Sequence, residues 1–207
     1  MTPTSVLLLA AIGSCAAAFA STRLRMGQLQ APVAPARGSG AAGVLYAFTV
    51  AFAPWSKESA SRHLPSYVAG IAYHVAVFTA LGALVYTLFG APLPPFAARA
   101  VAVALVPGLV CGAALLLKRC FDARLRATSV PEDFFANALV DLVLAAALAA
   151  TLAPRFVAAF QIAGAALLAY APLGKLRHMV LLLISRRAVG ATFGRRGVRP
   201  SAGAHRG

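Results

Sequence analysis

The chain has 207 residues, of which 60% are hydrophobic and only 12% charged, and its formal net charge is +14. Soluble domains carry about 25% charged residues, so this composition excludes an ordinary soluble globular protein. The basic residues lie in short loops and in the C-terminal segment, not on a folded basic domain with interleaved aromatic residues, which argues against nucleic-acid binding. The sequence predicts an all-α, polytopic membrane helix bundle.

Several apolar runs along the chain are long enough to cross a membrane. The first, residues 3–20, has its basic residues after it and not before it, so we expect an uncleaved span and not a signal peptide. Residues 44–55 are also apolar, but a run of about 13 residues is too short for a hydrocarbon core of about 30 Å and is predicted to be interfacial or re-entrant. The last apolar run is long, so either Pro172 and Gly174 kink it or its end projects into the cytoplasm. The four later spans are predicted at residues 65–90, 97–117, 134–153 and 155–185.

The basic loops set the predicted orientation, because loops rich in Lys and Arg stay in the cytoplasm. Five spans with the N-terminus outside and the C-terminus inside place every such loop on the cytoplasmic side of the cell inner (plasma) membrane. The predicted organisation is a first transmembrane helix (1–22), a linker with the short apolar segment (23–63), a four-helix membrane domain (64–185) and a basic cytoplasmic tail (186–207).

Two histidines interrupt apolar runs, where an ionisable side chain is costly and a functional role is the first hypothesis. His74 lies about 15 Å, and His178 about 10 Å, from the cytoplasmic ends of their predicted spans. Either histidine alone could simply hydrogen-bond to a neighbouring helix. Two imidazoles at similar depth on different helices are what axial ligation of a b-type haem requires, so one haem b held by His74 and His178 is the preferred interpretation.

Three charged residues near these histidines have open roles. Lys175 and Arg177 flank His178 and would either neutralise haem propionates or extend to the lipid headgroups. Asp141 is predicted to lie about 12 Å from the cytoplasmic end of its span. It would orient a ligand histidine, pair with Arg177, or stay protonated against Asn137.

Three stretches give the chain a resemblance to a known family: GIAYHVAVF, ALLLKRCFDARLRATS and APLGKLRHMVLLLISRRAVG. They resemble the gamma subunit of respiratory nitrate reductases and the related haem b membrane subunits of heterodisulfide-reductase-like and sulfite-reduction-associated complexes. The resemblance implies five membrane helices and electron transfer between membrane quinol and an iron–sulfur partner. His74 and His178 match the positions of the family's ligands for the haem nearest the cytoplasm.

The chain departs from the nitrate reductase pattern at the second, outer haem. The places of the two further histidines fall at or near Leu84 and around Phe160. One haem is therefore expected, and the quinone site that adjoins the outer haem in the family is left open. Arg99 would contact a quinone or, more simply, lie at the membrane interface.

The sequence thus predicts a haem b subunit of a respiratory electron-transfer complex. It would relay electrons between the quinone pool and a cytoplasmic iron–sulfur or molybdoenzyme partner and would not be catalytic alone. Membrane lipid is the other expected contact, quinone binding to this subunit is left open, and nucleic acid is not an expected partner. The alternatives are a cofactor-free membrane anchor, in which both histidines would be dispensable, and a small transporter, against which the lack of internal repeats counts.

Overall fold

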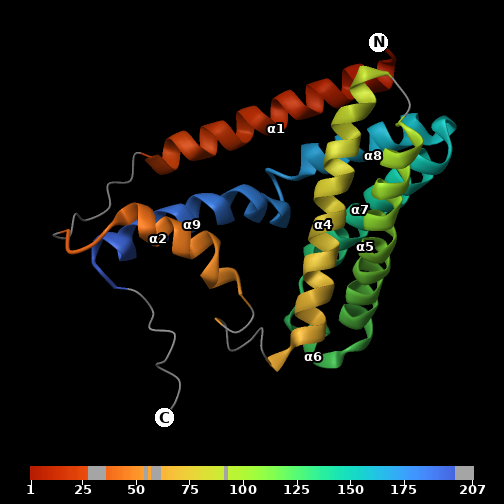
Figure 1. Cartoon of the computed structure of the whole chain (residues 1–207). Helices are drawn as coiled ribbons and strands as arrows, with labels where there is room; N and C mark the ends of the chain where they lie inside the picture. Colours follow the sequence, from red (N-terminus) through yellow and green to blue (C-terminus); the bar gives the residue numbers. More distant parts are fainter. Residues whose placement is uncertain (28–35, 54–55, 57–61, 91–92, 199–207) are drawn as a thin grey trace. The chain divides into compact units, whose positions relative to one another are not determined.

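The computed structural model describes residues 1–27, 36–53, 56, 62–90 and 93–198, and every regular element in these ranges is a helix. The predicted all-α class is confirmed for this part of the chain. The helices are drawn in Figure 1. They are α1 (Pro3–Gly27), α2 (Gly40–Phe48), α4 (Leu64–Tyr86), α5 (Pro95–Phe121), α6 (Ala123–Thr128), α7 (Pro131–Leu152), α8 (Val157–Tyr170) and α9 (His178–Arg195), with 3₁₀ turns η1 (Val50–Phe52), η3 (Thr87–Phe89), η4 (Pro154–Phe156) and η5 (Lys175–Arg177).

Four of the described helical segments are long and apolar enough to cross a membrane: Pro3–Met26, Leu64–Phe89, Pro95–Phe121 and Pro131–Leu152. A fifth results if Pro154–Tyr170 and Lys175–Arg195 are counted as one broken span. The nine-residue α2 is too short to cross in helical form, as expected for the apolar segment at 44–55. Residues 54–55 of that segment lie outside the described part.

Of the two possibilities for the last apolar run, the kink at Pro172 and Gly174 is the one that the structure contains, since the run forms two helices with a turn between them. The backbone N–H groups of Leu173 and Gly174 both donate to the Tyr170 carbonyl oxygen, each at 3.0 Å. The boundary expected between the last span and the tail, at 185/186, falls inside α9, which continues to Arg195.

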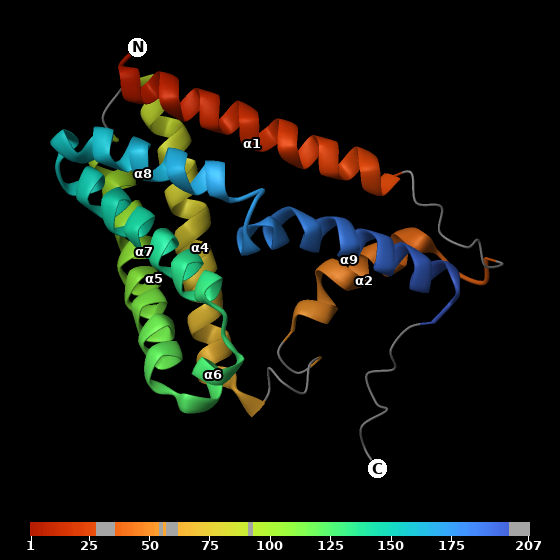
Figure 2. The ribbon, with the colours of Figure 1, turned by 180° about the vertical axis from the view of Figure 1, so that it is seen from behind.

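The chain divides into two compact units, each described here by itself. Unit 1 comprises Met1–Ala18 and Pro65–Arg177, and unit 2 comprises Phe19–Leu64 and His178–Gly207. In unit 1, α5 and α7 run alongside one another, α4 approaches α5 closely where Ala76 meets Gly108, and α8 turns back from α7 at η4 (Figures 1 and 2). Its core brings together side chains from α1, α4, α5, α7 and α8, among them the fully buried Leu8, Leu84, Leu105, Leu144 and Phe160.

Small residues bring the helices of unit 1 close together. A Cβ atom added at Gly108 of α5 would overlap the Ala76 side chain of α4, and one at Gly164 of α8 would overlap Leu84. Apolar surface gains little from leaving an apolar bilayer, so close van der Waals contact at small residues is the usual way in which membrane helices associate. This packing fits helices that cross a membrane.

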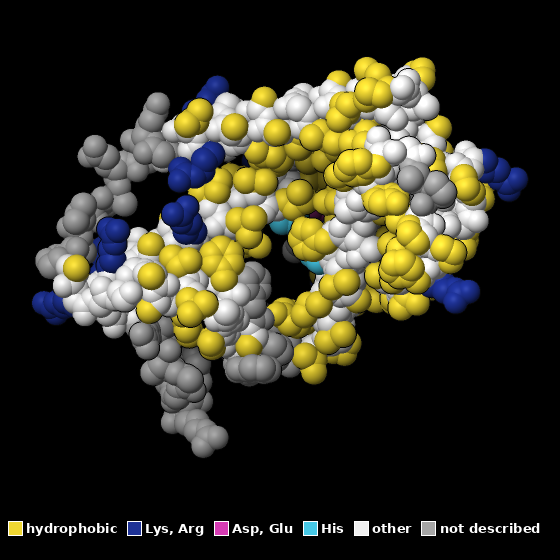
Figure 3. Space-filling view, turned by 45° about the horizontal axis from the view of Figure 1, so that its top comes forward, with side chains coloured by type: hydrophobic (Ala, Val, Ile, Leu, Met, Phe, Trp, Pro, Cys, Tyr) yellow, Lys and Arg dark blue, Asp and Glu magenta, His cyan; other side chains and the backbone are white. Residues whose placement is uncertain are grey.

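The outer faces of the unit 1 helices expose large apolar side chains. Val103 is 74% exposed, Val110 64% and Phe78 61%. Hydrophobic side chains cover much of the part of unit 1 seen in Figure 3, and Lys and Arg stand at its edge. A soluble monomer rarely exposes apolar patches of this extent, whereas lipid covers them at no cost.

In unit 2, α2 packs against α9 at glycines spaced four residues apart on α9. A Cβ at Gly43 of α2 would overlap the Gly190 carbonyl oxygen, and one at Gly194 would overlap the Ser39 carbonyl oxygen. The Arg195 carbonyl oxygen accepts hydrogen bonds from the backbone N–H of Arg37 at 2.7 Å and of Gly38 at 2.9 Å. Part of the predicted basic tail is therefore a helix docked on the short apolar segment.

We expect Gly43→Leu to separate α2 from α9, because the new side chain meets backbone that cannot move aside, and overpacking of this kind costs about 1–3 kcal/mol or more. Trypsin should then cleave α9 at Arg186 and Arg187 several-fold faster than in the wild type. Gly40→Ala is the matched control, since its Cβ would meet chiefly the flexible Arg195 side chain, at 3.3 Å. Equal cleavage rates in the two variants would contradict the packing described here.

Candidate functional site

His74 of α4 has one ring nitrogen fixed and the other available. Its Nδ1 lies 2.6 Å from the carbonyl oxygen of Gly70, one helical turn earlier. A carbonyl only accepts, so Nδ1 carries the hydrogen in the neutral ring, and Nε2 keeps its lone pair. Within the described ranges, Nε2 has no hydrogen-bond partner. This is the tautomer and the orientation that a metal-ligating histidine needs.

The face of α4 around His74 is apolar and open. Ile71 is 50% exposed, Val75 52% and Phe78 61%. A Cβ at Gly70 would meet no atom within 4 Å, so packing does not require glycine there. A flat apolar group could therefore approach the helix backbone beside the imidazole.

Tyr73 joins a polar cluster with residues of α5 and α7. Its hydroxyl donates to the backbone oxygen of Asn137 at 3.3 Å, and the Asn137 side-chain amide donates to the Tyr73 oxygen at 3.2 Å. The same amide donates to Asp141 Oδ2 at 2.9 Å and to the Gly112 carbonyl oxygen at 3.4 Å. A Cβ at Gly112 would overlap both Asp141 Oδ1 and the Tyr73 ring, so only glycine leaves room for the carboxyl group.

Three contacts were expected for Asp141, and the structure contains the one with Asn137. In the described part of the chain, Asp141 makes no hydrogen bond to His74 and no ion pair with Arg177. The Tyr73 and His74 rings are neighbours along the chain, with centroids 6.5 Å apart in an edge-to-face arrangement. The cluster and the candidate ligand thus share one turn of α4.

An ion-pair cluster joins α5, α7 and η5 at one end of unit 1. Lys175 Nζ donates to Asp133 Oδ1 at 2.6 Å, and Arg119 lies 3.5 Å from the other oxygen of the same carboxylate. Glu132 Oε1 accepts from the Tyr170 hydroxyl at 3.0 Å and from the Lys175 backbone N–H at 2.8 Å. These bonds hold the turn that breaks the last apolar run.

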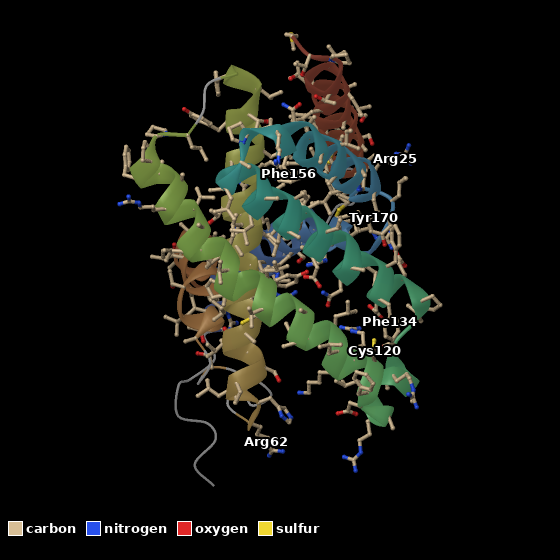
Figure 4. The ribbon with its side chains drawn as sticks, turned by 90° about the vertical axis from the view of Figure 1, so that its right-hand side faces the viewer. Arg25, Arg62, Cys120, Phe134, Phe156 and Tyr170 are labelled. Carbon is tan, nitrogen blue, oxygen red and sulfur yellow. The ribbon has the colours of Figure 1, made fainter. Side chains whose placement is uncertain are left out.

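The ion pair gives Lys175 a role that the sequence analysis missed, beside the two that were expected for it. The signal that could have revealed this role is the acidic pair Glu132 and Asp133 in the first turn of α7, where carboxylates also interact favourably with the helix dipole. Figure 4 shows Phe134 and Cys120 at this end of unit 1 and Phe156 at the other.

A second polar cluster lies at the opposite end of unit 1. The side chain of Gln161 is only 2% exposed. Its Oε1 accepts from the Thr4 hydroxyl at 2.5 Å, and its Nε2 donates to Ser5 at 3.2 Å and to Thr87 at 3.1 Å. One fully bonded amide therefore ties α1 and η3 to α8, which no sequence pattern revealed.

Core side chains occupy the two positions at which the sequence resemblance had placed a second histidine pair. Leu84 and Phe160 are each 1% exposed and belong to the core of unit 1. Arg99 lies exposed in the first turn and a half of α5.

His178 is the first residue of α9, and its side chain is exposed. It belongs to unit 2, whereas His74 belongs to unit 1, and each is placed within its own unit. Arg177, beside it in the sequence, is the last residue of η5 and is also exposed. No group of three or more His, Cys, Asp or Glu side chains suited to a metal ion occurs within the described ranges.

In the described part of the chain, these features define the class of the protein: all-helical, with four helices able to cross a membrane, or five if the bent pair is one span, and polar clusters among them. No family model, curated protein or solved structure matches the chain.

We expect Glu132→Ala to loosen the turn before His178, because the variant loses the acceptor of two hydrogen bonds. Trypsin should cleave after Lys175 several-fold faster, measured by mass spectrometry of the released peptides. Asp122→Ala is the control: that carboxylate only accepts from the backbone N–H groups of Arg124 and Leu125 and caps α6. Cleavage after Lys175 that stays at the wild-type rate would show that Glu132 does not hold the turn.

Proposed function

We propose that the protein is the haem b subunit of an electron-transfer complex in the cell inner membrane. It relays electrons between the quinone pool and a cytoplasmic iron–sulfur or molybdoenzyme partner. The observation that carries the proposal is His74. Its Nδ1–H is held by the Gly70 carbonyl and its Nε2 is available, on an open apolar face of a helix long enough to cross a membrane.

The residues around His74 fit a haem. The Gly70 carbonyl fixes the ring orientation and raises the basicity of the ligating nitrogen. The absence of a side chain at Gly70 leaves space for a macrocycle, and Ile71 and Phe78 supply apolar cover. A haem held between two imidazoles supplies one-electron exchange at its iron and binds no substrate there.

The second ligand in this proposal is His178, which the sequence selects by its depth and by the family resemblance. Lys175 precedes it by three residues and is bonded to Asp133. Neutralisation of propionates by Lys175 would therefore compete with that ion pair, and the exposed Arg177 is the simpler candidate. A quinone enters the proposal only as electron donor or acceptor.

The proposed topology has five spans, with the N-terminus outside and the C-terminus in the cytoplasm. It counts α8 and α9 as the two parts of one broken span. The cytoplasmic partner would meet the end of unit 1 that carries Lys118, Arg124 and Arg126, all exposed. Positive charge there would speed and orient the approach of an acidic partner surface.

The central experiment is a reduced-minus-oxidised visible spectrum of the full chain, purified after expression with ample haem, together with haem stoichiometry. We expect one b-type haem per chain, lost in both His74→Ala and His178→Ala. His63→Ala is the control, since its side chain is exposed and outside the predicted ligand pair. A wild-type chain without haem would favour the cofactor-free anchor.

A second test uses two glycines of α4 at which an added Cβ meets nothing within 4 Å. Gly70→Leu should reduce haem occupancy at least several-fold, because the new side chain occupies the space beside the His74 ring. Gly82→Leu, two turns beyond His74, should fold equally well and keep its haem. Equal occupancy in the two variants would mean that the haem does not lie against α4 at Gly70.

A further inference from the structure

We propose that Asp141 is a proton-binding site inside the α7 span, occupied by one proton at neutral pH. The inference goes beyond the electron-transfer proposal and does not depend on a haem. It is carried by the geometry of the cluster that Asp141 forms with Asn137 and Tyr73.

The position of Asp141 places it far from water if α7 crosses a membrane. It lies ten residues after the first residue of α7, or about 15 Å along a 22-residue helix. An ionised carboxylate at that depth is costly unless a cation or several donors stabilise it.

The groups that face Asp141 do not include a cation. Tyr73 is the titratable group that α4 contributes, α5 contributes Gly112, and α7 contributes Asn137. Asp141 takes part in no ion pair within the described ranges. The Tyr73 hydroxyl, which also interacts with the carboxyl group, donates to a backbone carbonyl at 3.3 Å.

The hydrogen bonds of the carboxyl group are too few for an anion. Asp141 Oδ2 accepts one bond, from the Asn137 amide at 2.9 Å, and that amide is shared with the Tyr73 oxygen and the Gly112 carbonyl. Asp141 Oδ1 is buried and, within the described part, has no hydrogen-bond partner. A carboxylate offers about four acceptor positions, so most would be left without donors, whereas the neutral acid needs fewer.

Gly112 shows that the carboxyl group is built into the helix packing. A Cβ at Gly112 would overlap Asp141 Oδ1 and the Tyr73 ring, so the α5 backbone closes over the group. The site therefore holds its proton between three helices, and release of that proton would place a negative charge there.

The test is infrared spectroscopy of the full-length protein in lipid nanodiscs at neutral pH, comparing wild type, Asp141→Asn and Asp133→Asn. We expect Asp141→Asn to remove the C=O stretching band of a protonated carboxyl group. Asp133→Asn should instead remove carboxylate intensity, because Asp133 pairs with Lys175 at the end of the same helix. Loss of carboxylate intensity, with no protonated band affected, in Asp141→Asn would overturn the proposal.

A second variant tests the contacts. Asn137→Leu removes the donor to Asp141, so the protonated band should persist to higher pH than in the wild type. A band that disappears at the same pH or at a lower pH would contradict the role assigned to the Asn137 amide. The Asp141→Asn variant keeps an oxygen atom that can accept a hydrogen bond from the Asn137 amide, so we expect this variant to fold.

Discussion

A bilayer offers no water to a polar side chain, so each polar group inside it must find its partners within the protein. For helices that cross a membrane, this constraint accounts for the polar contacts of Gln161 and Asn137. The Gln161 amide joins α1, η3 and α8, and the Asn137 amide joins α4, α5 and α7. Glu132 and Asp133 join α7 to the end of α8, to η5 and to α5. A few polar residues thereby join particular helices, although large apolar side chains cover much of the outer face of unit 1.

The same constraint sets His74 and Asp141 apart. In the other clusters the polar atoms hydrogen-bond to one another, whereas His74 Nε2 and Asp141 Oδ1 have no hydrogen-bond partner in the described part of the chain. His74 Nε2 has its lone pair on an open face beside Gly70, where packing does not require glycine. Asp141 Oδ1 is enclosed at Gly112, where packing does require glycine. The first arrangement suits an added ligand, and the second suits a proton.

The sequence predicted the all-helical class and the long apolar helices of the described part, because hydropathy is local. The long apolar runs, the shortness of the segment at 44–55 and the break at Pro172 and Gly174 all follow from composition and from backbone chemistry. The bonds of Gln161 and Lys175 could not be predicted in this way, since they depend on which helix faces meet. The basic residues of α9 concealed a helix, and the four-residue spacing of Gly190 and Gly194 was the signal that could have revealed it.

The electron paramagnetic resonance spectrum of the oxidised, full-length protein tests the central claim most directly, because it reports the axial ligands of a ferric haem. We expect one low-spin signal of the kind that two imidazole ligands give, and its loss in His74→Ala and in His178→Ala, because each variant loses the haem. A protein that contains haem but gives the same low-spin signal in either variant would contradict the ligand pair. If the wild-type protein, expressed with ample haem, gave no haem signal, that result would contradict the proposed function itself.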